Sequence, residues 1–76
     1  MQISNESLFE VVANSLNVPV DSLSLESGRD SLKDWDSMGH IMLMLAVERR
    51  FGRKLPFEAI ERIRTIADIQ AALLKG

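Results

Sequence analysis

The sequence contains no cysteine, and it has only one tryptophan and one histidine, His40. Without cysteine the chain can form neither a disulfide nor a thiolate metal site, and nothing points to an oxidising compartment. A single histidine argues against a structural zinc site, so we expect no metal centre. A chain of 76 residues buries only roughly 60% of the surface that its unfolded form exposes. We therefore expect the fold to depend on apolar packing alone.

Long hydrophobic runs are also missing. No segment approaches the ~20 consecutive apolar residues of a membrane span. The stretch from Met1 to Glu10 lacks the basic region and apolar run of a secretory signal. We therefore expect one domain over residues 1–76, located in the cytoplasm.

The net charge of −2 is unevenly spread along the chain. Residues 1–38 carry two basic and seven acidic side chains, whereas residues 39–76 carry seven basic and four acidic ones. Such asymmetry is typical either of a charged docking face or of an ordinary solvated surface. The acidic overall balance and the few aromatic residues argue against a nucleic-acid partner, despite the basic cluster near residues 49–54.

The first helix is predicted from about residue 4 to residue 16, where apolar side chains recur every three or four positions. Ser4 or Asn5 can cap its start, and Pro19 prevents easy continuation. Residues 19–36 are rich in Ser, Asp and Gly, with isolated leucines that we expect to reach into the core. This segment predicts an ordered loop that crosses from one end of a helix bundle to the other, with room for one short helical turn.

The second helix is predicted from Ser37 to Phe51, with Gly52 as its stop signal. One face forms a core stripe by its spacing, namely Leu43, Met44, Val47 and Phe51. A second apolar group remains, namely Met38, Ile41, Met42 and Leu45. Either the helix is buried nearly all round, or this second group is an exposed docking surface. The basic residues after the helix fit the negative end of its dipole, and they also suit an acidic partner.

Two further helices complete the predicted fold. A short helix follows Pro56, and a last helix begins at Thr65, with Asp68 placed to complete a capping box. We therefore predict an all-α, four-helix bundle with a long loop between the first and second helices and a short third helix.

Asp36 and Ser37 stand where the polar loop becomes the apolar second helix. Asp36 is a favourable N-cap residue, because its carboxylate can accept hydrogen bonds from the free N–H groups of the first turn. A phosphate attached to the Ser37 hydroxyl would meet those N–H groups and the positive end of the helix dipole. Ser37 is therefore well placed to carry a phosphorylated group.

Several motifs carry a family resemblance. They are the tripeptide Asp36-Ser37-Met38, the helix end Glu48-Arg49-Arg50-Phe51-Gly52, and then Leu55-Pro56 and Thr65-Ile66-Ala67-Asp68. By these motifs and their spacing the sequence resembles the acyl carrier protein family, from about Ser4 to Leu74. The match at Met38 is to a leucine in the family's Asp-Ser-Leu motif.

The resemblance implies that Ser37 receives 4′-phosphopantetheine from coenzyme A through a separate phosphopantetheinyl transferase, with Asp36 as the acidic neighbour that assists this transfer. The arm would carry acyl or aminoacyl groups as thioesters between loading, synthase and transferase enzymes of fatty acid or polyketide biosynthesis. The chain itself would be a monomer and not an enzyme. We expect these partners to dock on the residues after Ser37, namely Met38, His40, Ile41, Met42 and Leu45.

Three departures from the family pattern set this chain apart. Carriers of fatty acid synthesis are commonly acidic along the exposed face of this helix, whereas Glu48 is the only acid here, which indicates a specialised carrier rather than the housekeeping one. Trp35 replaces a small residue and can either pack the loop or shield the arm. Met38 replaces leucine, a volume-conserving change of small expected effect. Apart from these departures, Gly39 is costly in a helix, by roughly 1 kcal/mol relative to alanine; its missing side chain either allows close approach of a partner or the arm, or is a tolerated cost.

Two other functions compete with the carrier. Ser37, His40 and Asp36 are the residue types of a hydrolytic triad, but no residue is evidently placed to orient the histidine, which we expect at the surface. The second is an unmodified carrier-like docking module, against which the intact Asp36-Ser37 pair argues.

Overall fold

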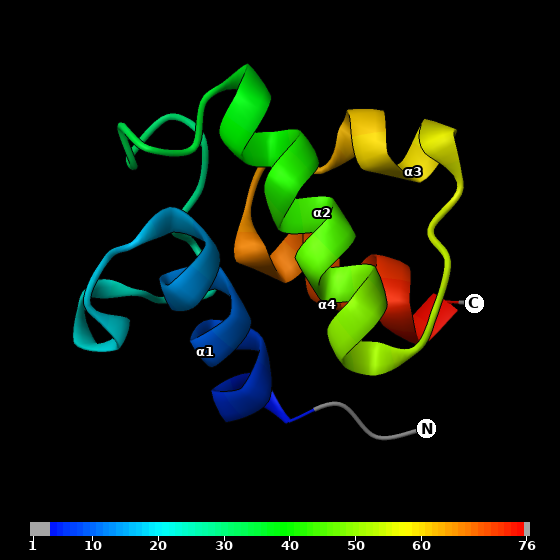
Figure 1. The fold of residues 1–76 in the computed structure, drawn as a ribbon, viewed down its shortest axis with the longest axis horizontal. Coiled ribbons are helices and arrows are strands. Elements are labelled where there is room, and N and C mark those ends of the chain that lie inside the picture. Colours follow the sequence, from blue (N-terminus) through cyan, green and yellow to red (C-terminus); the bar gives the residue numbers. More distant parts are fainter. Residues whose placement is uncertain (1–3, 76) are drawn as a thin grey trace.

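The computed structural model describes residues 4–75, which fold into helices wrapped around one core (Figure 1). The elements in chain order are α1 (Asn5–Leu16), the short 3-10 helix η1 (Val20–Ser22), α2 (Ser37–Phe51), α3 (Phe57–Arg62) and α4 (Ile66–Lys75). No strand forms within this range, so the predicted all-α bundle with a long first loop and a short third helix is confirmed. None of the helices between residues 4 and 75 is long and apolar enough to cross a membrane.

Local capping explains where α1 and α2 begin and end. The Ser4 hydroxyl accepts a hydrogen bond from the Ser7 N–H at 3.0 Å and caps α1, whereas Asn17 ends that helix in the left-handed conformation. Gly52 ends α2 in the same way, with φ of 64°. These signals lie next to the segments that they delimit, which is why the sequence predicts both helices to within one residue.

The core lies between α1, α2 and α4. Its buried apolar side chains are Leu8, Val11, Val12, Leu16, Trp35, Leu43, Met44, Val47, Leu55, Ile63, Ile66, Ile69 and Leu73. Three leucines of the long loop are partly buried against this core, as the sequence predicts, namely Leu23, Leu25 and Leu32. Val20 is different, because it belongs to η1 and remains exposed.

The long loop does not cross the bundle, so that prediction is wrong. In Figure 1, α1 and α2 run side by side in opposite directions, and the loop leaves the end of α1 and returns beside it. The end of α1 therefore meets the start of α2: Leu16, Asp34 and Gly39 line one shared groove. The length of the loop is used instead to reach the start of α4.

The loop and α4 are joined through their backbones. The Ile66 N–H donates to the Ser27 carbonyl oxygen, and the Ala67 N–H donates to the Leu25 carbonyl oxygen, both at 2.9 Å. The first N–H groups of a helix have no partner within the helix, so the loop satisfies two of these donors. The predicted capping box is also present: the Asp68 N–H donates to Thr65 Oγ1, and the Thr65 N–H donates to Asp68 Oδ2, both at 3.2 Å.

Gly28 packs against the backbone just before α4, and its replacement is expected to be costly. A Cβ atom at Gly28 would overlap the carbonyl oxygen of Arg64. Overpacking against a backbone atom that cannot rotate away should lower the free energy of unfolding by about 2 to 3 kcal/mol in Gly28→Ala. Urea denaturation followed by far-UV circular dichroism measures this difference.

Gly52→Ala is the matched control for that experiment. A Cβ atom there meets open space, but the residue has φ of 64°, so only conformational strain applies. We expect a loss of about 1 kcal/mol. Equal losses in the two variants would contradict the close contact between Gly28 and Arg64.

Candidate functional site

Ser37 is the first residue of α2, and its side chain is exposed. The preceding Asp36 caps the helix, because its Oδ1 accepts a hydrogen bond from the Gly39 N–H at 2.8 Å. The predicted N-cap is therefore confirmed. This bond directs one carboxylate oxygen into the first turn and leaves the Ser37 hydroxyl at the positive end of the helix dipole.

A groove lies beside the residues that flank Ser37. This groove, of about 560 Å³, opens beside the start of α2. It is lined by Ser15, Leu16, Asp34, Asp36, Met38, Gly39, Met42, Leu45, Ala46 and Arg49. Asp36 and Met38, the two neighbours of Ser37, line this groove, and Ser37 itself is exposed.

Trp35 and His40 form a buried pair beneath the site. Trp35 is 1% exposed and His40 is 6% exposed. The indole N–H of Trp35 donates to His40 Nδ1 at 2.9 Å, and His40 Nε2 lies 2.8 Å from the carbonyl oxygen of Ile60 in α3. An indole can only donate, so Nδ1 accepts, and the neutral ring carries its proton on Nε2, which donates to Ile60. The pair thus ties the loop, α2 and α3 together.

The predicted surface position of His40 is wrong, and its place among the docking residues is wrong with it. The sequence did contain the signal for burial: His40 precedes Leu43 by three residues, Met44 by four and Val47 by seven, which is the spacing of the core stripe of α2. A histidine on that stripe is buried when both ring nitrogens find partners, as they do here. Trp35 packs the loop onto the helix, which decides between its two predicted roles.

The same geometry excludes a hydrolytic triad of Ser37, His40 and Asp36. Both ring nitrogens of His40 are occupied by Trp35 and Ile60, so this ring cannot accept a proton from the Ser37 hydroxyl. The Asp36 carboxylate bonds to Gly39 and not to the histidine.

The structure gives a different explanation for the glycine at position 39 than the approach of a partner or of the arm. A Cβ atom at Gly39 would overlap the carbonyl oxygen of Asp34. The missing side chain of Gly39 therefore makes room for the loop before α2. This close approach brings the polar turn before Ser37 against the helix that carries it.

The remaining docking candidates are exposed along one side of α2. We call Met38, Ile41, Met42 and Leu45 the apolar surface; their exposed fractions are 77%, 60%, 59% and 52%. Of the two positions that the sequence allowed for this group, core or surface, the structure shows the surface. A contiguous apolar group next to a helix start is typical of an interaction site.

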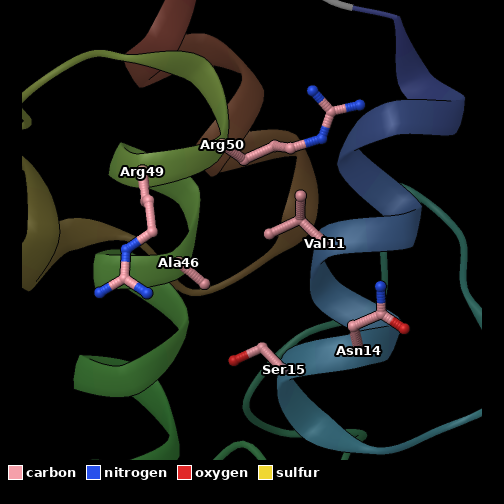
Figure 2. Close-up of a pocket in the computed structure, with 6 residues that line it drawn as sticks. All are labelled: Val11, Asn14, Ser15, Ala46, Arg49 and Arg50. Carbon is pink, nitrogen blue, oxygen red and sulfur yellow. The ribbon is translucent and has the colours of Figure 1, made fainter.

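The basic residues at the other end of α2 border this surface. We call Arg49, Arg50, Arg53 and Lys54 the basic cluster. In Figure 2, Arg50 is directed toward α1, near Val11, whereas Arg49 is turned away from α1. The Arg50 guanidinium lies 5.8 Å from the centre of the Phe51 ring, a cation–π contact. Arg49 lines the groove beside the start of α2 together with Met38 and Leu45, so it connects the basic cluster to the apolar surface.

Glu48, the one acid of α2, has a structural partner. Its Oε2 accepts a hydrogen bond from the Leu55 N–H at 2.7 Å, and the residue is half-buried. This bond fastens the turn after α2 and helps to place Leu55 in the core. The exposed side of α2 therefore presents apolar and basic groups and no free-standing acidic row.

Comparison with known proteins identifies the family. The chain is 31% identical over 68 residues to an acyl carrier protein from Picosynechococcus sp., covering 84% of each chain. It is 32% identical over 66 residues to an acyl carrier protein from Helicobacter hepaticus, covering 87% of each. No family model matches the sequence.

The chain belongs to the acyl carrier protein family. It is accordingly a carrier protein and not an enzyme.

Proposed function

We propose that the protein carries acyl or aminoacyl groups as thioesters on a 4′-phosphopantetheine arm attached to Ser37. The observation that supports this most directly is the exposed hydroxyl of Ser37 at the start of α2, immediately after the N-cap Asp36. The phosphodiester of the arm would lie at the positive end of the helix dipole. When bound, the arm supplies the thiol that the cysteine-free chain lacks.

The chain's own residues would hold the attachment site still. Asp36 fixes the first turn through Gly39, and the Trp35–His40 pair fixes the loop on which Asp36 stands. The acidic side chain of Asp36 is also the group that we propose assists transfer of the arm from coenzyme A by a phosphopantetheinyl transferase. Loading, synthase and transferase enzymes of fatty acid or polyketide biosynthesis in the cytoplasm would then exchange cargo with the arm of a monomeric carrier.

The test is the intact mass of the folded protein after incubation with coenzyme A and a broad-specificity phosphopantetheinyl transferase. Addition of one phosphopantetheine per chain supports the proposal. If nothing is added while an established carrier is modified in parallel, the result favours either an unmodified docking module, which the exposed apolar surface would also serve, or a carrier that needs a dedicated transferase.

The apolar surface is proposed as the contact site of the transferase and of the later enzymes. Ile41→Asp and Leu45→Asp are expected to slow modification by the transferase severalfold, because a buried carboxylate would remain unpaired in the complex. Helicity and the free energy of unfolding should stay within about 0.5 kcal/mol of wild type, since both side chains are exposed. The measurements are the initial rate of modification and urea denaturation.

Leu74→Asp provides the matched control, because Leu74 is 56% exposed but lies on α4. Its modification rate should equal that of wild type. Broad unfolding of the Ile41 or Leu45 variant would show that these residues support the core, and the docking proposal would fail.

A further inference from the structure

Charged residues of opposite sign flank the exposed side of α2, acidic ones in the loop before it and basic ones at its end. Asp34 and Asp36 stand exposed beside Ser37, and the basic cluster stands around Gly52. The apolar surface occupies the turns between them. At a rise of 1.5 Å per residue, Arg49 lies roughly 18 Å along the helix from Ser37. Because the two ends differ in charge, a partner that covers this side can be held in one orientation.

The basic end is also hollowed. A groove of about 310 Å³ opens there. It is lined by Leu45, Glu48, Arg49, Gly52, Arg53 and Lys54. Leu45 belongs to the apolar surface as well, so the groove and that surface are continuous. Three cationic side chains face one carboxylate in this groove, and that carboxylate, on Glu48, already accepts the Leu55 N–H.

We propose that the partner enzymes of this carrier dock on α2 with an apolar patch and a cluster of acidic side chains, which enters the basic groove roughly 18 Å from Ser37. The proposal names the partner chemistry of the docking surface and rests on the proposed function for what docking delivers. Guanidinium groups bind carboxylates with two parallel hydrogen bonds, which fixes orientation as well as attraction. Complementary charge at one end then aligns the enzyme's active site with Ser37.

An anionic membrane is the other partner that apolar and basic groups attract. A helix that lies on a membrane carries basic residues along the length of its polar flanks. Here they are gathered at one end, and the exposed Asp34 and Asp36 at the other end would face lipid phosphates. The distribution of charge therefore favours an acidic protein surface.

The experiment uses two synthetic helical peptides with the same leucine stripe, one with a glutamate cluster and one with lysines in its place. Each is titrated at low salt into isotope-labelled protein, and binding is followed by NMR. Wild type should bind the glutamate peptide at least tenfold more tightly, with the largest shifts at the amides from Met38 to Arg53. In the double variant Arg49→Glu/Arg53→Glu, the affinity for the glutamate peptide should fall about tenfold and the preference should invert.

The double variant Arg62→Glu/Arg64→Glu has the same net charge change at exposed residues outside α2, and its affinities should stay within about twofold of wild type. Equal affinity for the two peptides, or an equal loss in this control, would overturn the proposal. So would arginine-dependent binding to phosphatidylglycerol vesicles without any peptide preference. All titrations use the unmodified protein, so failure of Ser37 to accept the arm refutes the proposed function without changing these results.

Discussion

Ser37→Ala protein is expected to gain no phosphopantetheine from coenzyme A, whereas wild type gains one group per chain. The phosphodiester needs a hydroxyl at the start of α2, and alanine removes only that atom. Asp36 would still cap the helix through Gly39, and Ser37 is exposed, so the fold should remain unchanged. Intact-mass spectrometry separates the two outcomes completely, and circular dichroism confirms that the variant is folded.

Ser15→Ala is the matched control for this result. Ser15 lines the same groove as Asp36 and Met38, but its hydroxyl belongs to α1. This variant should accept one phosphopantetheine at the wild-type rate. Modification of Ser37→Ala would show that another residue carries the arm, and the site would have to be assigned again.

Trp35→Ala is expected to be the most destabilising single change outside the helices. The indole is 1% exposed, and its removal leaves both a cavity and an unpaired His40 Nδ1. Truncating a buried aromatic side chain lowers the free energy of unfolding by about 3 to 5 kcal/mol. Small domains have roughly 0.05 to 0.15 kcal/mol of stability per residue, about 4 to 11 kcal/mol for a chain of 76 residues, so this loss removes a large share of the total. Urea denaturation followed by far-UV circular dichroism measures the loss.

Trp35→Phe separates packing from hydrogen bonding. Phenylalanine keeps an aromatic ring in the core but cannot donate to His40, so we expect a smaller loss, about 1 to 3 kcal/mol. Loss of less than 1 kcal/mol in Trp35→Ala would mean that the loop before Ser37 is held by other contacts, and the buried pair would have no supporting role.

The parts of the fold that sequence alone predicts are those with local causes. Ser4, Asp36 and Gly52 act on backbone groups within a few residues, so they reveal the ends of α1 and α2 before any tertiary contact is known. The place of Ser37 at the start of α2 is predicted for the same reason, since its cap and its helix are adjacent. The exposure of the apolar surface needed the structure, because a helix of this composition can be buried on either face.

The parts that were wrong depend on distant segments. The bond between His40 and Ile60 joins residues of α2 and α3, and the loop's path depends on α4. Gly39 is explained by the Asp34 carbonyl oxygen, a steric contact that leaves no pattern in the sequence. His40 alone could have been corrected in advance, because its spacing from Leu43 and Val47 places it on the buried stripe.

The junction between the long loop and α4 has a consequence for the order of folding. The carbonyls of Leu25 and Ser27 reach the N–H groups of Ile66 and Ala67, far along the chain. Contacts of such wide sequence separation form late, since the chain between them must first be ordered. We therefore expect the segment that leads to Ser37 to reach its final position only once the C-terminal helix has docked. A modifying enzyme that recognises this segment would act on the completed bundle and pass over a chain still being synthesised.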